Sequence, residues 1–466
     1  MAARRGPDHA PGAGVLRLRL ASLLLVLLLG IASAASRNIR FADLPPQARQ
    51  WLSERGISAR GFAGLVQAKE LRTKQRLLRG ENDHLVYFLL QSSRFTRHPA
   101  IEPALSAREF VEGLNPERRL QYLSGHDSEP ALAEQIPNPV RRRIDDLAAA
   151  LARPASDERL SHYRKFLEAE RDPRARLRAE YVRSMRFLYL KEFLPAAAGP
   201  VEEQSRLAAL YQQRGHSTDT RMEANYAVWT ALSVLRALSP SIRLDPVLIV
   251  GPGLDFAPRT ELVEQLPPQS YQPFALADAL LSLDLADARR WRIDCVDINP
   301  RVVDHLRDFP KRSQPRLTLV TGYQDPAYVE YFEKLGRHIA RQAPSHLPPG
   351  AYRGKTLWIR PEVARRVTAH ELDIVTRRQD PSPRYGLVVA TNVFAYFDSF
   401  ELLLALSNIE AMLRPGGYLV HNELRAELES FSRGLGLSPI QARSLRLTAE
   451  SQPTLGDAFL IHRKTP

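Results

Sequence analysis

The first half of the chain carries its hydrophobic residues mainly at helical spacing. Residues 141–151 form one amphipathic segment that Pro154 closes, and Leu160, Tyr163 and Leu167 recur every three or four positions. No stretch of residues 41–240 alternates cleanly between apolar and polar positions. Because a period near 3.6 is typical of helices and a period of two is typical of strands, we predict an α-helical domain over residues 36–220.

After residue 244 the pattern changes to short apolar runs separated by helical stretches. The runs cover residues 247–250, 291–296, 317–320, 367–374, 387–390, 418–420 and 458–461, with helical patterns over 274–285 and 400–413. Short buried strands that alternate with helices indicate a doubly wound α/β sheet, which binds ligands at the C-terminal ends of its strands. We therefore predict a second domain of this class over residues 221–466.

The N-terminal stretch fits neither pattern. An uncharged apolar run over residues 20–36 contains the small residues 32–34 and follows four basic residues, Arg4, Arg5, Arg17 and Arg19. This arrangement is typical of a secretory signal peptide, and the run is shorter than the ~20 residues of a membrane-spanning helix. We expect export, with the mature chain starting near Ala35. An uncleaved membrane anchor over residues 1–35 and a buried helix are the alternatives, and the protein is cytoplasmic if the segment is not used.

Length and composition are those of a globular protein of two or three domains. The chain has 466 residues, 44% of them hydrophobic and 25% charged, which argues against a disordered or multi-span membrane protein. Cys295 is its single cysteine, so an intramolecular disulfide framework is excluded. The net charge of +13 could suit an acidic partner. Because basic and acidic residues are interleaved, we expect a solvated surface and disfavour nucleic acid as a partner.

The first strand of the predicted sheet ends in a glycine-containing loop. Its candidate ligand-binding residues are Gly251, Pro252, Gly253 and Asp255. Glycine lets the backbone turn sharply and approach a ligand closely. The third glycine of a dinucleotide-binding fingerprint is missing, since Phe256 stands there. A loop against a nucleoside is therefore favoured over a pyrophosphate cradle, and a plain strand-to-helix turn is the alternative.

The second strand ends at an acidic residue. Asp297, followed by Ile298, stands where a carboxylate can accept hydrogen bonds from both ribose hydroxyls of an adenosine. The alternative is that Asp297 caps the helix that starts near Pro300.

The strongest motif is A-T-N-V-F-A-Y-F-D over residues 390–398, which is followed by a helix and by L-R-P-G-G-Y-L over residues 413–419. The chain here resembles class I S-adenosylmethionine-dependent methyltransferases, and most closely the CheR-type subfamily with its R-N-V-x-x-Y-F-D segment. Residues 359–367 resemble that subfamily's small inserted hairpin, and residues 367–374 resemble the strand whose end meets adenine. The resemblance covers residues 245–423, under half of the chain.

The resemblance implies S-adenosyl-L-methionine as the cofactor and a Rossmann-like seven-stranded sheet. It implies that the glycine loop lies against the methionine moiety, that Asp297 binds ribose and that Asp373 accepts from the adenine amino group. Asn392 would lie near the transferred methyl. The cofactor-binding candidates are Gly251, Pro252, Gly253, Asp255, Asp297, Ile298, Asp373, Ile374 and Asn392.

Several positions depart from the family pattern. The T-x-F-F-R segment before the first strand is absent, and Thr220 with Arg221 is a loose substitute. Asp373 replaces an asparagine, Thr391 replaces the arginine of R-N-V, and residues 317–339 form an apparent insertion. The sequence therefore supports cofactor binding better than the subfamily's specificity for glutamate side chains.

Methyl transfer from a sulfonium is an in-line displacement that needs no metal and depends mainly on orientation. A neutral amine or hydroxyl acceptor benefits from a general base. The catalytic candidates are Asn392, Tyr396 and His421, with a structural role as the alternative for His421. The asparagine loop lacks N-P-P-Y, which argues against amino methylation of DNA bases.

The sequence leaves more than one function open. We expect a methyltransferase acting on an unidentified acceptor, either a protein side chain or a small molecule. The alternative is a non-catalytic binding or scaffolding protein on the same fold, because an exported enzyme would be separated from a cofactor made in the cytoplasm. A nicotinamide dehydrogenase is disfavoured by the missing third glycine, and a nucleic-acid binder is suggested by charge alone.

Overall fold

The computed structural model describes residues 35–125, 132–154, 156–194, 199–256, 264–344, 352–380, 385–449 and 454–466. The predicted signal segment, residues 1–35, lies outside these residues, except for Ala35, with which strand β1 (Ala35–Asn38) begins. Within the described part of the chain, none of the helices combines the length and the apolar character that a membrane span requires.

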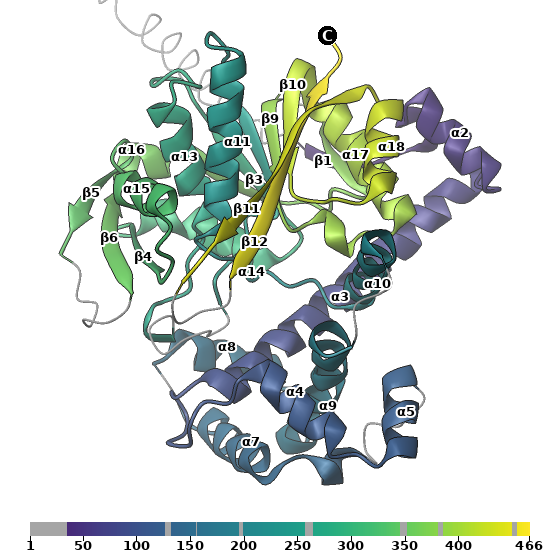
Figure 1. Ribbon diagram of the computed structural model, residues 1–466, viewed down its shortest axis with the longest axis vertical. Helices are drawn as coiled ribbons and strands as arrows, with labels where there is room; N and C mark the ends of the chain where they lie inside the picture. Colours follow the sequence, from purple (N-terminus) through teal and green to yellow (C-terminus); the bar gives the residue numbers. More distant parts are fainter. Residues whose placement is uncertain are drawn as a thin grey trace, which may run out of the picture.

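A seven-stranded sheet forms the centre of the C-terminal half, in the order β11-β12-β10-β9-β2-β3-β7 (Figure 1). Its parallel strands are β2 (Val247–Val250), β3 (Ile293–Asp297), β7 (Val367–Glu371), β9 (Tyr385–Ala390) and β10 (Leu413–His421). Strands β12 (Leu455–Lys464) and β11 (Leu437–Leu447) complete the sheet and are antiparallel to their neighbours. The prediction of a seven-stranded α/β sheet is confirmed.

Helices cover both faces of this sheet, which explains why its central strands β2 and β9 are buried along their whole length. Val247 and Ile249 pack into one hydrophobic cluster, whereas Leu248 and Val250 point to the opposite face and join a second cluster. The first face is covered by α11 (Ala224–Leu238), α13 (Gln272–Ser282) and α14 (Pro300–Asp308). The second is covered by α17 (Ser399–Met412) and α18 (Ala426–Gly434).

Almost all regular structure between residues 36 and 220 is helical, among the described residues. The helices are α2 (Pro46–Glu54), α3 (Ala59–Gln91), α4 (Pro103–Glu112), α5 (Pro116–Ser124), α7 (Asn138–Leu151), α8 (Glu158–Leu167), α9 (Pro173–Glu192) and α10 (Pro200–Gln213). Strand β1 is the exception and pairs with β8 (Arg377–Asp380). Both hydrophobic clusters combine residues from before and after residue 220, so the division at this residue stays a prediction.

The 33-residue helix α3 connects the two halves. In Figure 1 it runs from the group of helices α4, α7, α8 and α9 past the central sheet to the region of α2. Ser58 caps its first turn by accepting from the Gly61 amide. Its position next to the strand ends makes α3 part of the functional site described below.

A small side sheet is inserted between α14 and β7. It has the order β4-β6-β5, formed by β4 (Arg316–Thr321), β6 (Arg353–Ile359) and β5 (Ala340–Ala343), with α15 (Pro326–Lys334) beside it. The run at residues 317–320 is therefore a strand, but not one of the central sheet. The predicted hairpin over residues 359–367 is wrong: helix α16 (Pro361–Ala364) stands there, because proline at the first helical position favours a helical turn.

Candidate functional site

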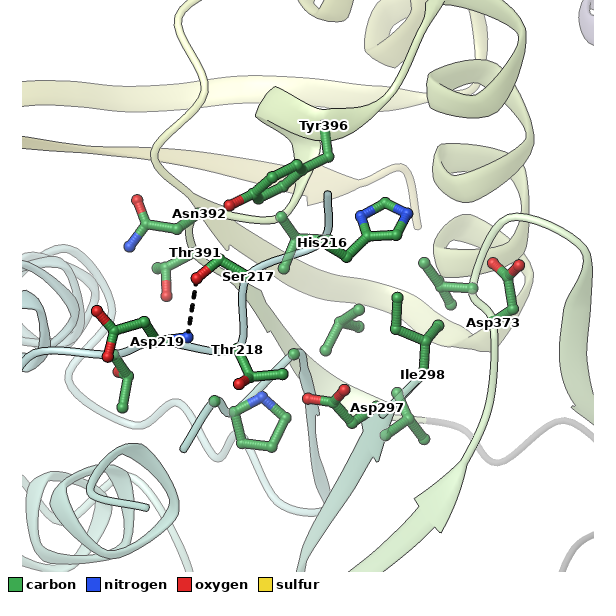
Figure 2. A pocket seen from close by; sticks show the side chains of 18 of the residues that line it. His216, Ser217, Thr218, Asp219, Asp297, Ile298, Asp373, Thr391, Asn392 and Tyr396 are labelled. Carbon is green, nitrogen blue, oxygen red and sulfur yellow. Dashed lines mark hydrogen bonds between the residues drawn. The ribbon is translucent and has the colours of Figure 1, made fainter. Parts of the chain in front are cut away.

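A pocket of about 880 Å³, partly open to solvent, lies at the C-terminal ends of β2, β3, β7 and β9 (Figure 2). Its wall includes these predicted residues: Gly251, Pro252, Gly253, Asp297, Ile298, Asp373, Ile374, Asn392 and Tyr396. The ends of the parallel strands thus bring together predicted residues that are 145 positions apart in the sequence, such as Gly251 and Tyr396. A cleft at the C-terminal ends of parallel strands is the usual ligand-binding position in a sheet of this class.

The glycine loop is a wall of the pocket as well as a turn. Gly251 and Gly253 have positive φ angles of 68° and 74°, which favour glycine. A Cβ atom at Gly253 would lie 2.9 Å from the carbonyl oxygen of Thr218, and one at Gly251 would lie 2.8 Å from a methyl of Val393. The Leu254 amide also donates to the Thr218 carbonyl over 2.7 Å. The loop is therefore packed against residues 216–220 without space for a side chain.

Asp297 lies buried at the end of β3. Its Oδ1 accepts from the Asn299 amide over 2.8 Å, while Asn299 itself caps α14 by accepting from the Arg301 amide. The alternative that Asp297 is the helix cap is therefore wrong. Burial raises the pKa of Asp297 to about 7, against the opposing effect of hydrogen bonds from the Asn299, Gly253 and Ile298 backbone. A carboxylate in this position can accept hydrogen bonds from ligand hydroxyls.

Asp373 follows β7 on the opposite side of the pocket from Asn392 (Figure 2). Its Oδ1 accepts from the Val375 amide over 2.9 Å, and its Oδ2 accepts from the Thr73 hydroxyl over 3.1 Å. Burial raises the pKa of Asp373, whereas both hydrogen bonds lower it. The side chain is thus an oriented acceptor facing the pocket, held by a residue of the N-terminal half.

Asn392 lies at the exposed end of the pocket. Its φ angle of 58° is in the left-handed region, which asparagine tolerates better than most residues. The amide of Asn392 donates to Asn422 Oδ1, and Asn392 Oδ1 accepts from Asn422 Nδ2, both over 2.8 Å. This reciprocal pair fixes the loop after β9 to the end of β10.

Tyr396 belongs to the short helix η4 (Phe394–Tyr396) and lines the same end of the pocket. Its ring makes edge contacts with Tyr211 and His216, with centroids 5.7 and 5.4 Å apart. Burial raises the pKa of Tyr396, so its phenol stays neutral near neutral pH and can orient a ligand by hydrogen bonding.

Two candidate residues lie outside the pocket lining. His421, a catalytic candidate, is fully buried behind β10, where its Nε2 shares a hydrogen bond of 3.1 Å with His462 Nδ1. Its Nδ1 accepts from the Glu423 amide, and burial lowers its pKa well below the ordinary value. These surroundings match the alternative that His421 has a structural role. Asp255, a cofactor-binding candidate, is buried and accepts from the Tyr271 hydroxyl over 2.9 Å.

The structure adds pocket residues that sequence reasoning missed. They are Thr73 and Leu77 of α3, residues 216–220, Gln272 and Thr391, among others. Gln272 donates to the Thr391 hydroxyl over 2.8 Å, linking α13 to the asparagine loop. The sequence gives one indication of residues 216–220: Thr220 is a loose substitute for the threonine of the family's T-x-F-F-R segment. No local pattern marks Thr73, because its partner Asp373 is 300 positions away.

The charged side chains of the pocket are acidic. Asp219, Asp297 and Asp373 line it, and none of its described lining residues is a lysine or arginine. Burial, reinforced by Arg76 and Arg72, lowers the pKa of His216 to about 3, so this imidazole is neutral. The pocket therefore suits a ligand with positive charge and disfavours a diphosphate, whose binding needs cationic groups or helix N-termini.

Comparison with known proteins found similarity at the level of solved structures. No protein-family model and no curated protein matches the sequence. The chain is similar to the N-methyltransferase NodS from Bradyrhizobium japonicum in complex with S-adenosyl-L-homocysteine, with 15% identity, a TM-score of 0.27, and coverage of 57% of this chain and 98% of that one. It is also similar to a TehB-like SAM-dependent methyltransferase from Corynebacterium glutamicum, with 12% identity, a TM-score of 0.26, and coverage of 52% and 98%.

Proposed function

We propose that this chain binds S-adenosyl-L-methionine in the pocket and transfers its methyl group to an acceptor, either a protein side chain or a small molecule. The observation that carries the proposal is the pocket itself, which joins the glycine loop, Asp297, Asp373 and Asn392 at neighbouring strand ends. The match of residues 392–398 to the CheR-type segment supports a relationship to that subfamily.

The residues present fit this cofactor. Asp297 can accept from ribose hydroxyls, and Asp373 can accept from the amino group of adenine. The cofactor carries a sulfonium and an ammonium group against one carboxylate, so its net positive charge suits an acidic pocket. A nicotinamide dinucleotide would instead place a diphosphate among these carboxylates, which disfavours a dehydrogenase.

When bound, the cofactor supplies a methyl group activated by its positive sulfur. The protein's own contribution is to hold the nucleoside and to leave the mouth beside Asn392 and Tyr396 open to an acceptor. Orientation of this kind can account for a large part of a rate enhancement. His421 lies outside the lining, so we do not assign it as a general base; an acceptor that is already ionised, such as a carboxylate, needs none.

Calorimetric titration of the full chain with S-adenosylhomocysteine tests the proposal. We expect the wild-type protein to bind, and Asp297→Ala to lose about 30-fold or more in affinity, because hydrogen bonds to a charged group contribute about 1.5–3 kcal/mol each. Asp304→Ala is the matched control, since Asp304 is an exposed residue of α14 outside the lining. Absence of binding to the wild-type protein at millimolar ligand would overturn the proposal.

A labelling experiment separates the enzyme from the non-catalytic alternative. Protein captured on the full chain, or a panel of small amines, carboxylates and hydroxyl compounds, is incubated with cofactor that carries a tritiated methyl group. Transfer of label supports the enzyme. Tight binding of S-adenosylhomocysteine without transfer to any of these acceptors would favour a binding or scaffolding protein.

A further inference from the structure

Helix α3 contacts segments at both ends of the pocket: the open end beside Asn392 and Tyr396, and the closed end formed by Asp297 and Asp373. Its Arg76 guanidinium donates to the Tyr396 carbonyl over 2.8 Å, and its Arg76 carbonyl accepts from the His216 amide over 2.9 Å. Further along the helix, Glu81 accepts from Asn299 Nδ2 over 2.8 Å, and Asn299 is two positions after Asp297. The helix is therefore part of the site's framework and not only a connector between two halves.

The position of α3 against the pocket is fixed by charge and by close packing. Lys69 and Arg72 hold Asp398 and Glu401 at the start of α17, with Arg72 Nη1 2.8 Å from Asp398 Oδ2 and Lys69 Nζ 3.2 Å from Glu401 Oε1. Gly80 crosses residues 215 and 216 so closely that a Cβ atom would meet the His216 carbonyl. Thr73, between these two anchors, has little freedom to move relative to Asp373.

We propose that Thr73 is a positioning residue for purine specificity: its hydroxyl, presented by α3, holds the Asp373 carboxylate as an acceptor for the 6-amino group of the bound purine. The inference rests on the proposed function and names what the closed end of that pocket selects. Thr73 and Asp373 both line the pocket, and the hydroxyl donates to Oδ2 over 3.1 Å. Each carboxylate oxygen has two lone pairs, so both oxygens of Asp373 can accept a further hydrogen bond.

The charges around Asp373 explain why this hydroxyl matters. Glu401 on α17 faces Asp373 and disfavours its ionised form, while Lys69, Arg72 and Arg76 on α3 bind Glu401 and its neighbour Asp398. The Thr73 hydroxyl and the Val375 amide favour the ionised form by donating to it. Without the hydroxyl the carboxyl would be protonated at higher pH, and a protonated carboxyl carries a donor that suits a 6-oxo group instead.

The test compares the binding of two probes over a range of pH. S-adenosylhomocysteine carries the 6-amino group, and S-inosylhomocysteine carries an oxo group in its place. Titrations of wild type, Thr73→Val and Thr73→Ser are made between pH 6 and pH 8.5. Lys74→Ala is the matched control, because Lys74 is an exposed residue of the same turn outside the pocket lining.

We expect Thr73→Val to weaken binding of S-adenosylhomocysteine by about tenfold near pH 7, because an Asp373 carboxyl that is misplaced or protonated loses its hydrogen bond from the 6-amino group. The preference for the amino over the oxo probe should narrow, and the pH below which binding is lost should rise. Thr73→Ser should restore both properties, and Lys74→Ala should leave them unchanged.

Several outcomes would overturn the inference. An equal loss for both probes with an unchanged pH profile would show that Thr73 only supports the fold, and unchanged binding would show that it does not act at all. If Thr73→Val does not fold, as judged by thermal melting, Thr73→Ala is measured by the same criteria. Failure of the wild-type protein to bind either probe would overturn the proposed function itself, which distinguishes the two failures.

Discussion

The two ends of the pocket differ in how firmly the protein holds them. At the closed end, Asp297 and Asp373 accept hydrogen bonds from backbone amides and from Thr73, and α3 lies against the surrounding loops. At the open end, Asp219 and Asn392 are exposed to solvent, and Figure 2 shows them on the same side of the pocket. This difference fits the proposed function. The closed end would bind the nucleoside of the cofactor, and the open end would leave access for the methyl acceptor.

Gly253→Ala should have the largest effect, because the Gly253 backbone donates a hydrogen bond to Asp297. The added Cβ would lie 2.9 Å from the Thr218 carbonyl oxygen in a backbone with positive φ. Strain at such a site costs about 1–3 kcal/mol, so we expect affinity for S-adenosylhomocysteine to fall by about 10-fold to 100-fold. Gly416→Ala is the control: its φ is 72°, but its Cβ would meet nothing closer than a side-chain nitrogen at 3.5 Å. Equal losses of affinity in both variants would contradict the role of the loop.

Asp297→Asn should change how the stability of the protein depends on pH. Burial raises the pKa of Asp297 to about 7 from an ordinary 3.8, so the wild-type fold loses stability as the pH rises through this interval. An asparagine does not ionise, and we expect the variant without ligand to be more stable than wild type at pH 8 by about 1–3 kcal/mol. Denaturant unfolding at pH 5 and pH 8 measures the difference in free energy of unfolding between the variant and wild type. This difference should increase with pH. A difference that is independent of pH would show that the carboxylate does not titrate here.

Asn392→Ala should have the smallest effect on cofactor affinity, because it strikes the open end. Loss of the side chain removes the bond between Asn392 Oδ1 and Asn422 Nδ2 but leaves the closed end intact. We expect affinity for S-adenosylhomocysteine to change by less than about threefold, within the effect of one exposed hydrogen bond. The rate of methyl transfer should fall more than the affinity. A loss of affinity as large as that of Gly253→Ala would break the contrast between the two ends.

Two of the central strands, β2 and β9, could be predicted because each contains a continuous apolar run. Residues 247–250 and 387–390 are buried on both faces of the sheet, so neither contains the polar alternation that would obscure it. Since the C-terminal ends of parallel strands meet at one edge, Gly251, Asp297 and Asn392 could be expected to lie around one pocket. The structure places all three in its lining.

Other parts of the site could not be predicted because they depend on contacts between distant segments. Thr73 and residues 216–220 come to the pocket through the packing of α3, which no local periodicity reveals. Strand β11 was missed because most of its side chains are exposed and it contains no apolar run. His421 was assigned a catalytic role from its place at a strand end, but its side chain points to the pair with His462 and not to the pocket lining.

The pairing of β1 with β8 holds the first described residues of the chain against a segment that follows the pocket residue Asp373. Asn38 is the partner of Arg377, only four positions after Asp373. A group attached ahead of β1 would therefore be held near the β7–β8 segment that carries Asp373.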